Sequence, residues 1–400
     1  MIPDYSIYIH IPFCTHRCAY CDFNTYAGQE ALIPAYVDAL VREIEFVGTR
    51  FFSPDRAEDR KTAKAHTIFF GGGTPSLLTP DQFASIFQSL RSSFPLAEDA
   101  EITIEANPGT ISYEQLRELR GIGINRISYG VQSANAEELR MLERTHSFFG
   151  VLDAVKSARQ AGFENLNLDL IYGLPEQTLA SWQTTVKRIL DLHPEHISAY
   201  ALTLEHGTPF GRWASKGLLP LPDPDLAAEM YEWLSKTLEN NGYIQYEISN
   251  WSLPAHECRH NLQYWRGLPY LAFGAGAHGY AHGYRYSNVL RIKSYIERLN
   301  DFEPRSSNIE FPLSPATVNH HNQSFQDDMS EFMMTGLRLV QDGVSDKEFQ
   351  KRFGKSIVDE YGQEIEYLLK SGLIEYGAEE QIRLTRRGRL LGNHVFLRFI

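Results

Sequence analysis

The chain of 400 residues is long enough for two or three domains, and its 43% hydrophobic content excludes a disordered or fibrous protein. Asp and Glu outnumber Lys and Arg by 50 to 38, so the net charge of −12 excludes a broad basic surface for nucleic acid or anionic membranes. Four cysteines are too few for a disulfide framework, and no run of 18 apolar residues predicts a membrane span.

The first residues lack the features of a secretion signal. The segment from Met1 to Cys14 has no basic flank, and His10 and Pro12 interrupt its apolar stretch. Together with the low cysteine count, this segment leads us to expect a soluble protein of the reducing cytoplasm.

Short β-prone runs alternate with segments of helical spacing over the first 200 residues. This alternation predicts an α/β fold with a parallel sheet. Six βα units are fewer than the eight of a closed barrel, so we expect a partial (β/α)6 barrel with its reactive groups just past the strand ends. The predicted strands are 6–11, 66–70, 101–106, 126–131, 165–171 and 196–202, and the predicted helices are 33–47, 81–94, 113–119, 148–161 and 181–192.

Four regions are expected along the chain. Residues 1–220 form the partial barrel, 221–300 extend it, 301–324 are a polar linker, and 325–400 form a mostly helical C-terminal domain. Within the first region, residues 53–65 are charged and are interpreted as a solvated insertion. In the last region we predict helices at 325–339, 347–353 and 357–369, strands at 373–376 and 382–384, and a last helix through Val395, an order that resembles a winged helix.

The winged-helix-like order raises the question of DNA binding. From Ser345 onward the chain has 10 Lys or Arg and 9 Asp or Glu residues. Because phosphate contacts need clustered positive charge, we favour a packing or lid domain. A nucleic-acid regulator stays an alternative through one local basic group, which contains Arg383, Arg386, Arg387 and Arg389.

Three cysteines follow the first predicted strand at CxxxCxxC spacing, namely Cys14, Cys18 and Cys21. Three thiolates on one loop can hold an iron–sulfur cube and leave its fourth iron open for a substrate. The alternative is a zinc ion whose fourth ligand is His10 or His16, although structural zinc usually takes two separated ligand pairs.

Further polar groups follow the next strands of the predicted sheet. A glycine-rich turn with Gly72, Gly73 and Thr74 ends the second strand, where main-chain groups can approach a ligand closely. Because the strand ends of a parallel barrel face one mouth, we expect these groups to surround one site. The other members of this ring are Glu105, Gln132, Arg144 and Asp169.

The cysteine motif after the first barrel strand resembles the signature of the radical S-adenosylmethionine superfamily. This resemblance implies a [4Fe-4S] cluster on Cys14, Cys18 and Cys21. It also implies that the amino and carboxylate groups of S-adenosylmethionine chelate the fourth iron. Electron transfer would then split the sulfonium and form a 5′-deoxyadenosyl radical.

Over nearly the whole chain the sequence is similar to one branch of this superfamily, the oxygen-independent coproporphyrinogen III oxidases and the related HemW heme chaperones. The similarity implies which residues surround the cofactor, and we expect a loop with His278 and His282 to line the same cavity. The implied cofactor-binding residues are Tyr8, Tyr20, Gly72, Gly73, Thr74, Glu105, Gln132, Arg144, Asp169, Ala201 and His278.

Two segments separate the chaperones from the oxidases. Phe23 stands where the oxidases carry a fourth cysteine, which weakens the prediction of decarboxylase activity. On composition alone, His260 is better explained as a buried structural residue, but the resemblance implies heme binding by the HNxxYW segment with His260, Tyr264 and Trp265. Cys258 is either an accessory ligand or a small buried side chain.

The resemblance implies a cytoplasmic heme chaperone that passes heme to acceptor proteins and carries a [4Fe-4S] cluster and S-adenosylmethionine. An acceptor in a membrane would need only a transient contact, and no nucleic acid is expected as a partner. The alternative is an enzyme, a coproporphyrinogen III oxidase or dehydrogenase that decarboxylates propionates.

Overall fold

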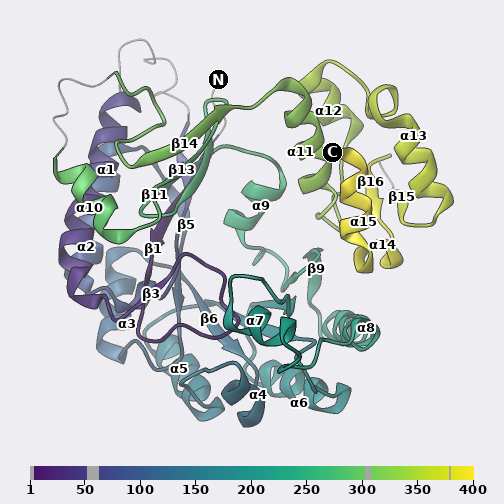
Figure 1. Ribbon diagram of the computed structural model, residues 1–400, viewed down its shortest axis with the longest axis horizontal. Helices are drawn as coiled ribbons and strands as arrows, with labels where there is room; N and C mark the ends of the chain where they lie inside the picture. The colour runs from purple at the N-terminus through teal and green to yellow at the C-terminus, as the bar shows by residue number, and fades with distance from the viewer. Residues whose placement is uncertain (1–3, 52–62, 302–307, 378–379) are drawn as a thin grey trace. The chain divides into compact units, whose positions relative to one another are not determined.

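The computed structural model describes residues 4–51, 63–301, 308–377 and 380–400. They form two compact units, each built from two segments of the chain (Figure 1). The first unit extends to Tyr231 and also includes Pro269–His321, and the second comprises Glu232–Leu268 and Asn322–Ile400. Residues 232–268, predicted as part of a barrel extension, therefore belong to the second unit.

The six predicted strands of the first unit are confirmed, and they lie side by side in chain order as a parallel sheet. Their apolar runs are largely buried, as expected where helices cover a parallel sheet. The sheet is open, because β1 borders β4 and β11 and does not pair with β8. The parallel strands are β1 (Tyr5–Ile11), β4 (Ala65–Gly72), β5 (Leu96–Ala106), β6 (Arg126–Gln132), β7 (Asn165–Tyr172) and β8 (His196–Ala201).

The sheet continues beyond β1 with strands that were not predicted. Strand β11 (Tyr270–Phe273) pairs in parallel with β1, and the next strands pair antiparallel in the order β11, β12, β13. The further strands are β12 (His278–Ala281), β13 (Tyr284–Asn288) and β14 (Thr317–Asn322). Part of the predicted linker, 301–324, is thus a strand, while 302–307 lie outside the described residues.

The predicted helices of the first unit are also confirmed, and Figure 1 shows them along the outside of the sheet. Helix α2 begins with a capping box in which Thr79 and Gln82 bond to each other's backbone amides, and α3 begins in the same way at Ser112. The helices are α1 (Ile33–Phe51), α2 (Pro80–Ser93), α3 (Tyr113–Ile122), α5 (Phe148–Gln160) and α6 (Leu179–Leu190).

Several short elements complete the first unit. Helix α4 follows β6, and α7 follows β8; both are too short to show a helical repeat in the sequence. Of the predicted insertion, 53–62 lie outside the described residues, and Ala65 already belongs to β4. The remaining elements are η1 (Glu30–Leu32), η4 (Pro75–Leu77), α4 (Ala136–Met141), α7 (Pro209–Ser215) and α10 (Ile292–Asn300).

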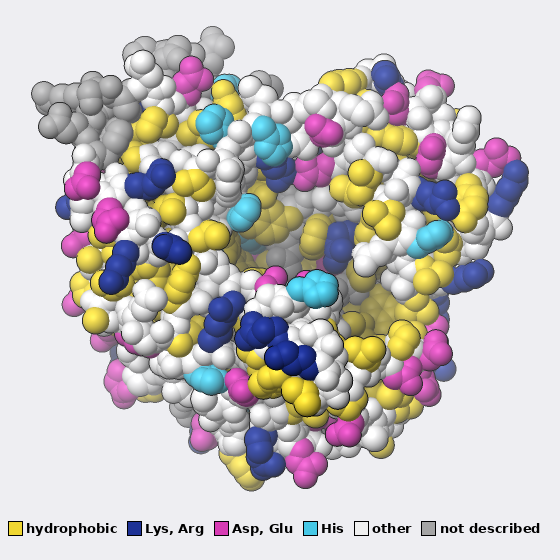
Figure 2. All heavy atoms as spheres, in the orientation of Figure 1, with side chains coloured by type: hydrophobic (Ala, Val, Ile, Leu, Met, Phe, Trp, Pro, Cys, Tyr) yellow, Lys and Arg dark blue, Asp and Glu magenta, His cyan; other side chains and the backbone are white. Residues whose placement is uncertain are grey.

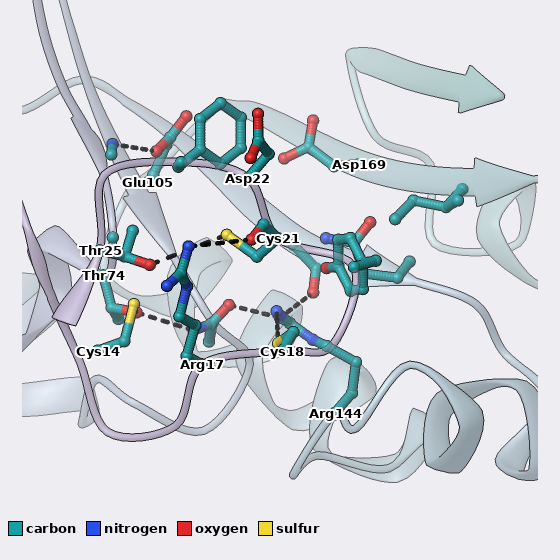
Figure 3. A pocket seen from close by; sticks show the side chains of 18 of the residues that line it. Cys14, Arg17, Cys18, Cys21, Asp22, Thr25, Thr74, Glu105, Arg144 and Asp169 are labelled. Carbon is teal, nitrogen blue, oxygen red and sulfur yellow. Dashed lines mark hydrogen bonds between the residues drawn. The ribbon is translucent and has the colours of Figure 1, made fainter. Parts of the chain in front are cut away.

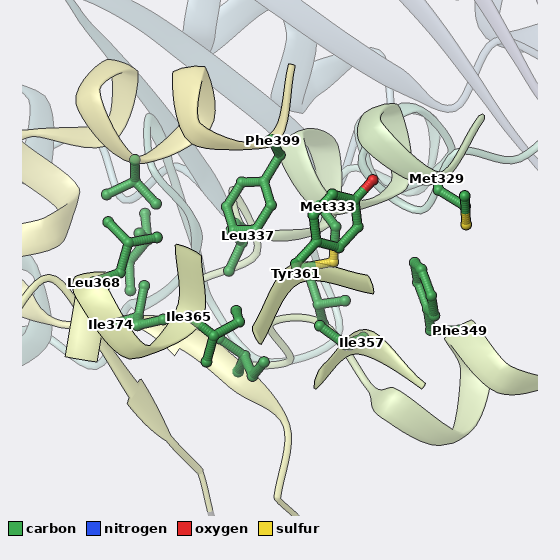
Figure 4. Close-up of a cluster of buried hydrophobic side chains, with 14 of the residues drawn as sticks. Met329, Met333, Leu337, Phe349, Ile357, Tyr361, Ile365, Leu368, Ile374 and Phe399 are labelled. Carbon is green, nitrogen blue, oxygen red and sulfur yellow. The ribbon is translucent and has the colours of Figure 1, made fainter. Parts of the chain in front are cut away.

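The second unit has its own hydrophobic core, which Figure 4 shows with Met333, Phe349, Tyr361 and Phe399 among its members. Helix α8 (Pro224–Asn240) enters this unit from the first. The three predicted helices from 325 and the hairpin are confirmed, whereas the predicted last helix is divided at Leu391 into two short helices. The elements are β9 (Ile244–Glu247), β10 (Asn250–Ser252), α9 (Arg259–Trp265), α11 (Phe325–Gly336), α12 (Asp346–Phe353), α13 (Ile357–Lys370), β15 (Ile374–Tyr376), β16 (Ile382–Leu384), α14 (Arg386–Leu390), α15 (Gly392–Phe396) and η6 (Leu397–Phe399).

The surface carries charges of both signs. On the face drawn in Figure 2, Asp and Glu side chains and Lys and Arg side chains are both scattered between hydrophobic and neutral groups. Among the described residues, no helix combines the length and the apolar character needed to cross a bilayer.

Candidate functional site

The cysteine motif lies in the loop that follows β1. This loop is closed at its base by two short parallel strands, β2 (Phe13–Cys14) and β3 (Tyr26–Ala27). The amide of Tyr26 donates to the carbonyl of Pro12 at 2.7 Å. The loop is therefore anchored at the C-terminal end of the first barrel strand, which is the position that the sequence predicts.

Two glycines after β4 let the cysteine loop pack closely against the sheet. A Cβ atom on Gly73 would lie 2.5 Å from the carbonyl oxygen of Phe13, and the Gly73 amide donates to Ile11 at 2.9 Å. Gly72 has a φ of +110°, and its Cβ would lie 2.4 Å from the ring of His10. A larger residue at Gly73 would force the loop away from the strand ends, and one at Gly72 would displace the ring of His10 on β1.

Each of the three cysteines has its own polar neighbour. The Thr74 hydroxyl donates to Cys14 Sγ at 3.6 Å, and the Arg144 guanidinium donates to Cys18 Sγ at 3.6 Å. Cys21 Sγ lies 4.0 Å from a threonine hydroxyl four residues later in the loop. Weak donors aimed at sulfur favour the thiolate form, which is the form that binds metals.

Burial acts in the opposite direction on these thiols. It raises the pKa of Cys14 above its ordinary value, and the hydrogen bond from Thr74 opposes this shift. Burial likewise raises the pKa of Cys21. A metal centre bound by this loop must therefore displace protons, and its positive charge would hold the ligands as thiolates.

Glu105 on β5 and Asp169 on β7 are two half-buried carboxyl groups that line the cavity beside the cysteine loop. Glu105 accepts from the Gly72 amide at 3.0 Å; burial, and next the charge of Asp169, raise the pKa of Glu105 to about 8. Burial also raises the pKa of Asp169, although hydrogen bonds from Ser128 at 2.8 Å and Asn167 at 2.7 Å oppose this shift. Two such acceptors suit the hydroxyl or amino groups of a polar ligand.

A buried amide network holds Asp169, and sequence reasoning missed it. Asn167 donates to Asp169 and to the hydroxyl of Ser128, the latter at 2.7 Å. Its Oδ1 atom lies 2.6 Å from His196 Nδ1 and accepts from Ser198 at 3.1 Å. The available signal was the strand period of two, which places Asn167 and Asp169 on the same face of β7.

Arg144 connects three of the loops around the site. Besides Cys18, its guanidinium bonds to the Asn107 side chain and to the carbonyl of Gly130, the latter at 2.6 Å. Asn107 in turn donates to the Thr74 hydroxyl at 3.1 Å. Asn107 was not predicted as a site residue, although its position two residues after Glu105 would have allowed it.

Gln132 adopts an unusual backbone conformation at the end of β6. Its φ is +67°, and the amide of Ser133 donates to the carbonyl of Val131 at 2.9 Å across it. A non-glycine residue in this region carries backbone strain that the surrounding structure must hold. The strain turns the chain sharply where Gln132 lines the cavity.

These groups surround one cavity of about 410 Å³ in the first unit. Figure 3 shows the three cysteine side chains around it, with Glu105 and Asp169 to one side and Arg144 to the other. Its volume is within the usual range of small-molecule sites. Of the predicted residues, those that line it are Cys14, Cys18, Tyr20, Cys21, Gly72, Gly73, Thr74, Glu105, Gln132, Arg144, Asp169 and Ala201.

Tyr8 and His278 are not among the residues that line this cavity. Tyr8 is half-buried on β1, and its hydroxyl lies 2.9 Å from His10 Nδ1. His278 is exposed at the start of β12, on an adjoining strand of the sheet. Strand β12 is separated from β1 by β11 alone, and the charge of His278 acts on His10 of β1. The role of the His278 loop at the cofactor therefore stays a prediction.

The histidines of the zinc alternative are engaged elsewhere. His10 Nε2 lies 2.9 Å from the carbonyl of Asn24, and its Nδ1 contacts Tyr8. His16 pairs with Glu143 at 3.2 Å. Among the residues that the structure describes, no group of three or more His, Cys, Asp or Glu side chains is arranged around a single ion. Three cysteines spread around a cavity suit a larger centre such as an iron–sulfur cube.

The HNxxYW segment forms α9 in the second unit. His260 and Tyr264 are one helical turn apart; His260 Nε2 lies 2.8 Å from the Tyr264 hydroxyl, and the ring planes meet at 84°. His260 and Cys258 are each 1% exposed. Trp265 follows directly and has a buried indole N–H without a partner among the described residues. His260 and Tyr264 are thus in contact, with the imidazole nitrogen beside a hydroxyl, and Trp265 ends the same helix.

Comparison with known proteins gives two family matches. Residues 8–189 match the model of the radical SAM superfamily, and residues 324–391 match the model of the HemN C-terminal domain. The first match covers the cysteine loop and most of the parallel sheet, and the second covers most of the second segment of the second unit.

Whole proteins are similar over the full length. The chain is 38% identical over 396 residues to the heme chaperone HemW of Bacillus subtilis, covering 99% of each chain. It is 34% identical to the heme chaperone HemW of Haemophilus influenzae, covering 100% of this chain and 98% of the other. Among solved structures, coproporphyrinogen III oxidase (HemN) from Escherichia coli, a radical SAM enzyme, has a TM-score of 0.80 and 25% identity, covering 100% of this chain and 90% of that one.

Proposed function

Because this chain belongs to the HemW family of radical SAM proteins, we propose that it is a heme chaperone, which binds heme and transfers it to acceptor proteins. The observation that carries this proposal is the α9 segment, where His260, Tyr264 and Trp265 lie together on one helix. An imidazole can ligate heme iron, and flat aromatic rings can cover part of a porphyrin face.

Heme binding at α9 requires a local rearrangement. His260 is buried, and its Nε2 atom is 2.8 Å from the Tyr264 hydroxyl, so iron cannot approach that nitrogen while this contact persists. The hydroxyl must turn away before the nitrogen can ligate iron. We infer that Tyr264 opposes ligation in the resting protein, which suits a carrier that must also release its cargo.

The cavity of the first unit fits a [4Fe-4S] cluster and S-adenosylmethionine. Cys14, Cys18 and Cys21 would hold the cluster, and the half-buried carboxyl groups of Glu105 and Asp169 would accept bonds from polar groups of the nucleoside. When bound, a cluster of this superfamily supplies an electron that splits the sulfonium. Arg144 would contribute a fixed positive charge beside Cys18 and orient that side of the site. The remaining proposed cofactor contacts are Tyr20, Gly72, Gly73, Thr74, Gln132 and Ala201.

The second candidate is coproporphyrinogen III oxidation by radical chemistry. The TM-score of 0.80 with coproporphyrinogen III oxidase and the complete ring of polar groups around the cavity favour it. Phe23 argues against it, because it lines the cavity with 67% of its surface exposed where the oxidases carry another cysteine. A phenyl ring there offers no ligand or hydrogen bond to a porphyrinogen carboxylate.

Acceptor proteins complete the proposed function. We place the transfer in the cytoplasm, with transient docking where the acceptor is bound to a membrane. DNA binding by the C-terminal helices is disfavoured, because the tail from Ser345 is nearly neutral overall and Arg383 already pairs with Glu375 at 2.9 Å.

The test is a hemin titration of anaerobically reconstituted protein. Wild type should develop the Soret band of ligated heme, and His260→Ala should weaken binding about tenfold or more, which corresponds to about 1.4 kcal/mol. His256→Ala is the matched control, since His256 precedes α9 and its Nδ1 atom lies 3.0 Å from the carbonyl of Pro254.

A parallel incubation with coproporphyrinogen III separates the two candidates. The chaperone proposal expects hemin to be bound and coproporphyrinogen III to stay unchanged. Decarboxylation of the propionates would instead support the oxidase proposal. The absence of any Soret band in wild type would contradict the chaperone proposal.

A further inference from the structure

Arg338 lies against the aromatic end of α9. Its guanidinium carbon is 4.3 Å from the centroid of the Trp265 ring and 5.9 Å from that of Phe396. The residue follows α11, and an antiparallel bridge between Leu339 and Glu247 of β9 fixes this stretch of chain. A cation is thus held in place directly beside the segment proposed to bind heme.

Two N–H donors at this point have no hydrogen-bond acceptor among the described residues. They are the Nε atom of Arg338 and the Nε1 atom of Trp265, and both atoms are buried. Buried donors are nearly always paired in folded proteins, because an unpaired one costs about 1 to 3 kcal/mol. Two unpaired donors on adjacent side chains indicate that this part of the second unit can accommodate an acceptor.

The acidic neighbour of Arg338 does not fill this role. Glu247 is completely buried, and its Oε2 atom is 3.7 Å from the Arg338 guanidinium, beyond hydrogen-bond distance. Its Oε1 atom accepts from the Ser249 amide at 2.9 Å and from the Asn250 side chain, whereas Oε2 has no hydrogen-bond partner among the described residues. The Arg338 side chain keeps 27% of its surface exposed, so an anion can approach its exposed part from solvent. The buried Nε atom of Arg338 and Nε1 atom of Trp265 would have to be uncovered by a local movement to bind it.

We propose that Arg338 and the indole N–H of Trp265 form an anion subsite that binds one propionate of heme. The inference rests on the proposed heme-binding function and adds a second anchor to it. Heme carries two carboxylates on one edge of a flat ring. A guanidinium over an indole face offers such a carboxylate charge-assisted hydrogen bonds, and the rest of the ring would lie along the aromatic side chains of α9.

The two anchors have separate roles. His260 would bind the iron, and Arg338 would bind the carboxylate edge and so set the orientation of the macrocycle. Glu247 competes with the propionate for Arg338, because both are carboxylates near the same cation. The subsite therefore selects for tetrapyrroles with free carboxylates, independently of iron ligation.

The experiment compares hemin with its dimethyl ester, in which both propionates are neutral, in the same detergent solution. Reconstituted wild type should bind hemin about ten times more tightly than the ester, as expected for a hydrogen bond between charged groups. In Arg338→Gln this preference should fall to within about twofold. Arg266→Gln is the matched control, since Arg266 follows Trp265 directly but is exposed and pairs with Asp342 at 3.2 Å.

A neutral double variant guards against misfolding. Arg338→Gln alone leaves the buried Glu247 without its cation, so Glu247→Gln/Arg338→Gln should fold normally and also show no preference for the free acid. Glu247→Gln alone removes the competing carboxylate and should increase the preference above that of wild type.

Failure of this inference is distinct from failure of the proposed function. If wild type and both Arg338 variants keep the same ratio of hemin to ester affinity, the subsite is wrong while heme binding stands. If wild type binds neither compound, the heme-chaperone proposal itself falls.

Discussion

Hydrogen bonding of the polar side chains differs between the cavity of the first unit and the α9 segment of the second unit. Around the cavity, Asp169, Asn107 and Cys18 each accept hydrogen bonds from neighbouring side chains, so the site keeps its shape without a ligand. At α9, His260 is engaged by Tyr264, and the buried donors of Trp265 and Arg338 have no acceptor among the described residues.

This difference matches the two proposed tasks. A preorganised site suits a cofactor that stays bound, because its side chains lose little conformational entropy on binding. A cargo that must leave is better served by a site in which internal contacts compete with the ligand. The comparison therefore predicts large, all-or-none effects at the cavity and graded effects at α9.

The largest effect is expected for Cys18→Ala. Removing one of the three thiolates should abolish the iron content and the visible absorption of the reconstituted cluster, because only Cys14 and Cys21 of the described cavity-lining residues would still offer a thiolate. Iron analysis after anaerobic reconstitution measures this. Cys258→Ala is the control and should keep its iron; iron loss in the control, or full iron in Cys18→Ala, would contradict the assignment.

A pH-dependent effect on stability should come next. Burial and the charge of Asp169 raise the pKa of Glu105 from 4.5 to about 8. The folded protein then holds a proton that the unfolded chain releases, so this contribution is complete below about pH 4.5 and is lost as the pH rises toward 8. For cofactor-free wild type, the free energy of unfolding should fall by about 1.4 kcal/mol per pH unit in this interval.

Glu105→Gln removes the titrating carboxyl group, so the free energy of unfolding should depend less on pH in the variant. Urea unfolding followed by circular dichroism at several pH values measures the two slopes. Equal slopes in wild type and variant would show that the carboxyl group is not held in its protonated form.

The smallest effect should be that of Tyr264→Phe. The variant frees His260 Nε2 while keeping the aromatic ring, so hemin affinity should rise about two- to tenfold, the range expected for one neutral hydrogen bond. Tyr367→Phe, at a half-exposed tyrosine on α13, is the control and should bind like wild type. Weaker hemin binding in Tyr264→Phe would mean that the hydroxyl assists heme rather than opposing it.

Local sequence patterns predicted most of the first unit. The period of β4 and β7 and the helical spacing of α1 are properties of neighbouring residues, so they are readable before folding. Strands β11 to β14 were missed because they are short, and their pairing with β1 and with one another joins segments distant in sequence. For the same reason residues 317–322 were interpreted as linker.

The candidate site also contains features that the local sequence predicts and features that depend on contacts between distant residues. Cys14, Cys18 and Cys21 lie within one loop. Their spacing in the sequence was therefore enough to predict a metal site. The contacts of Arg144 with Asn107 and of Arg338 with Trp265 join residues that only folding brings together. Spacing in sequence specifies local geometry, whereas burial, pKa shifts and unpaired donors depend on neighbours that the chain acquires when it packs.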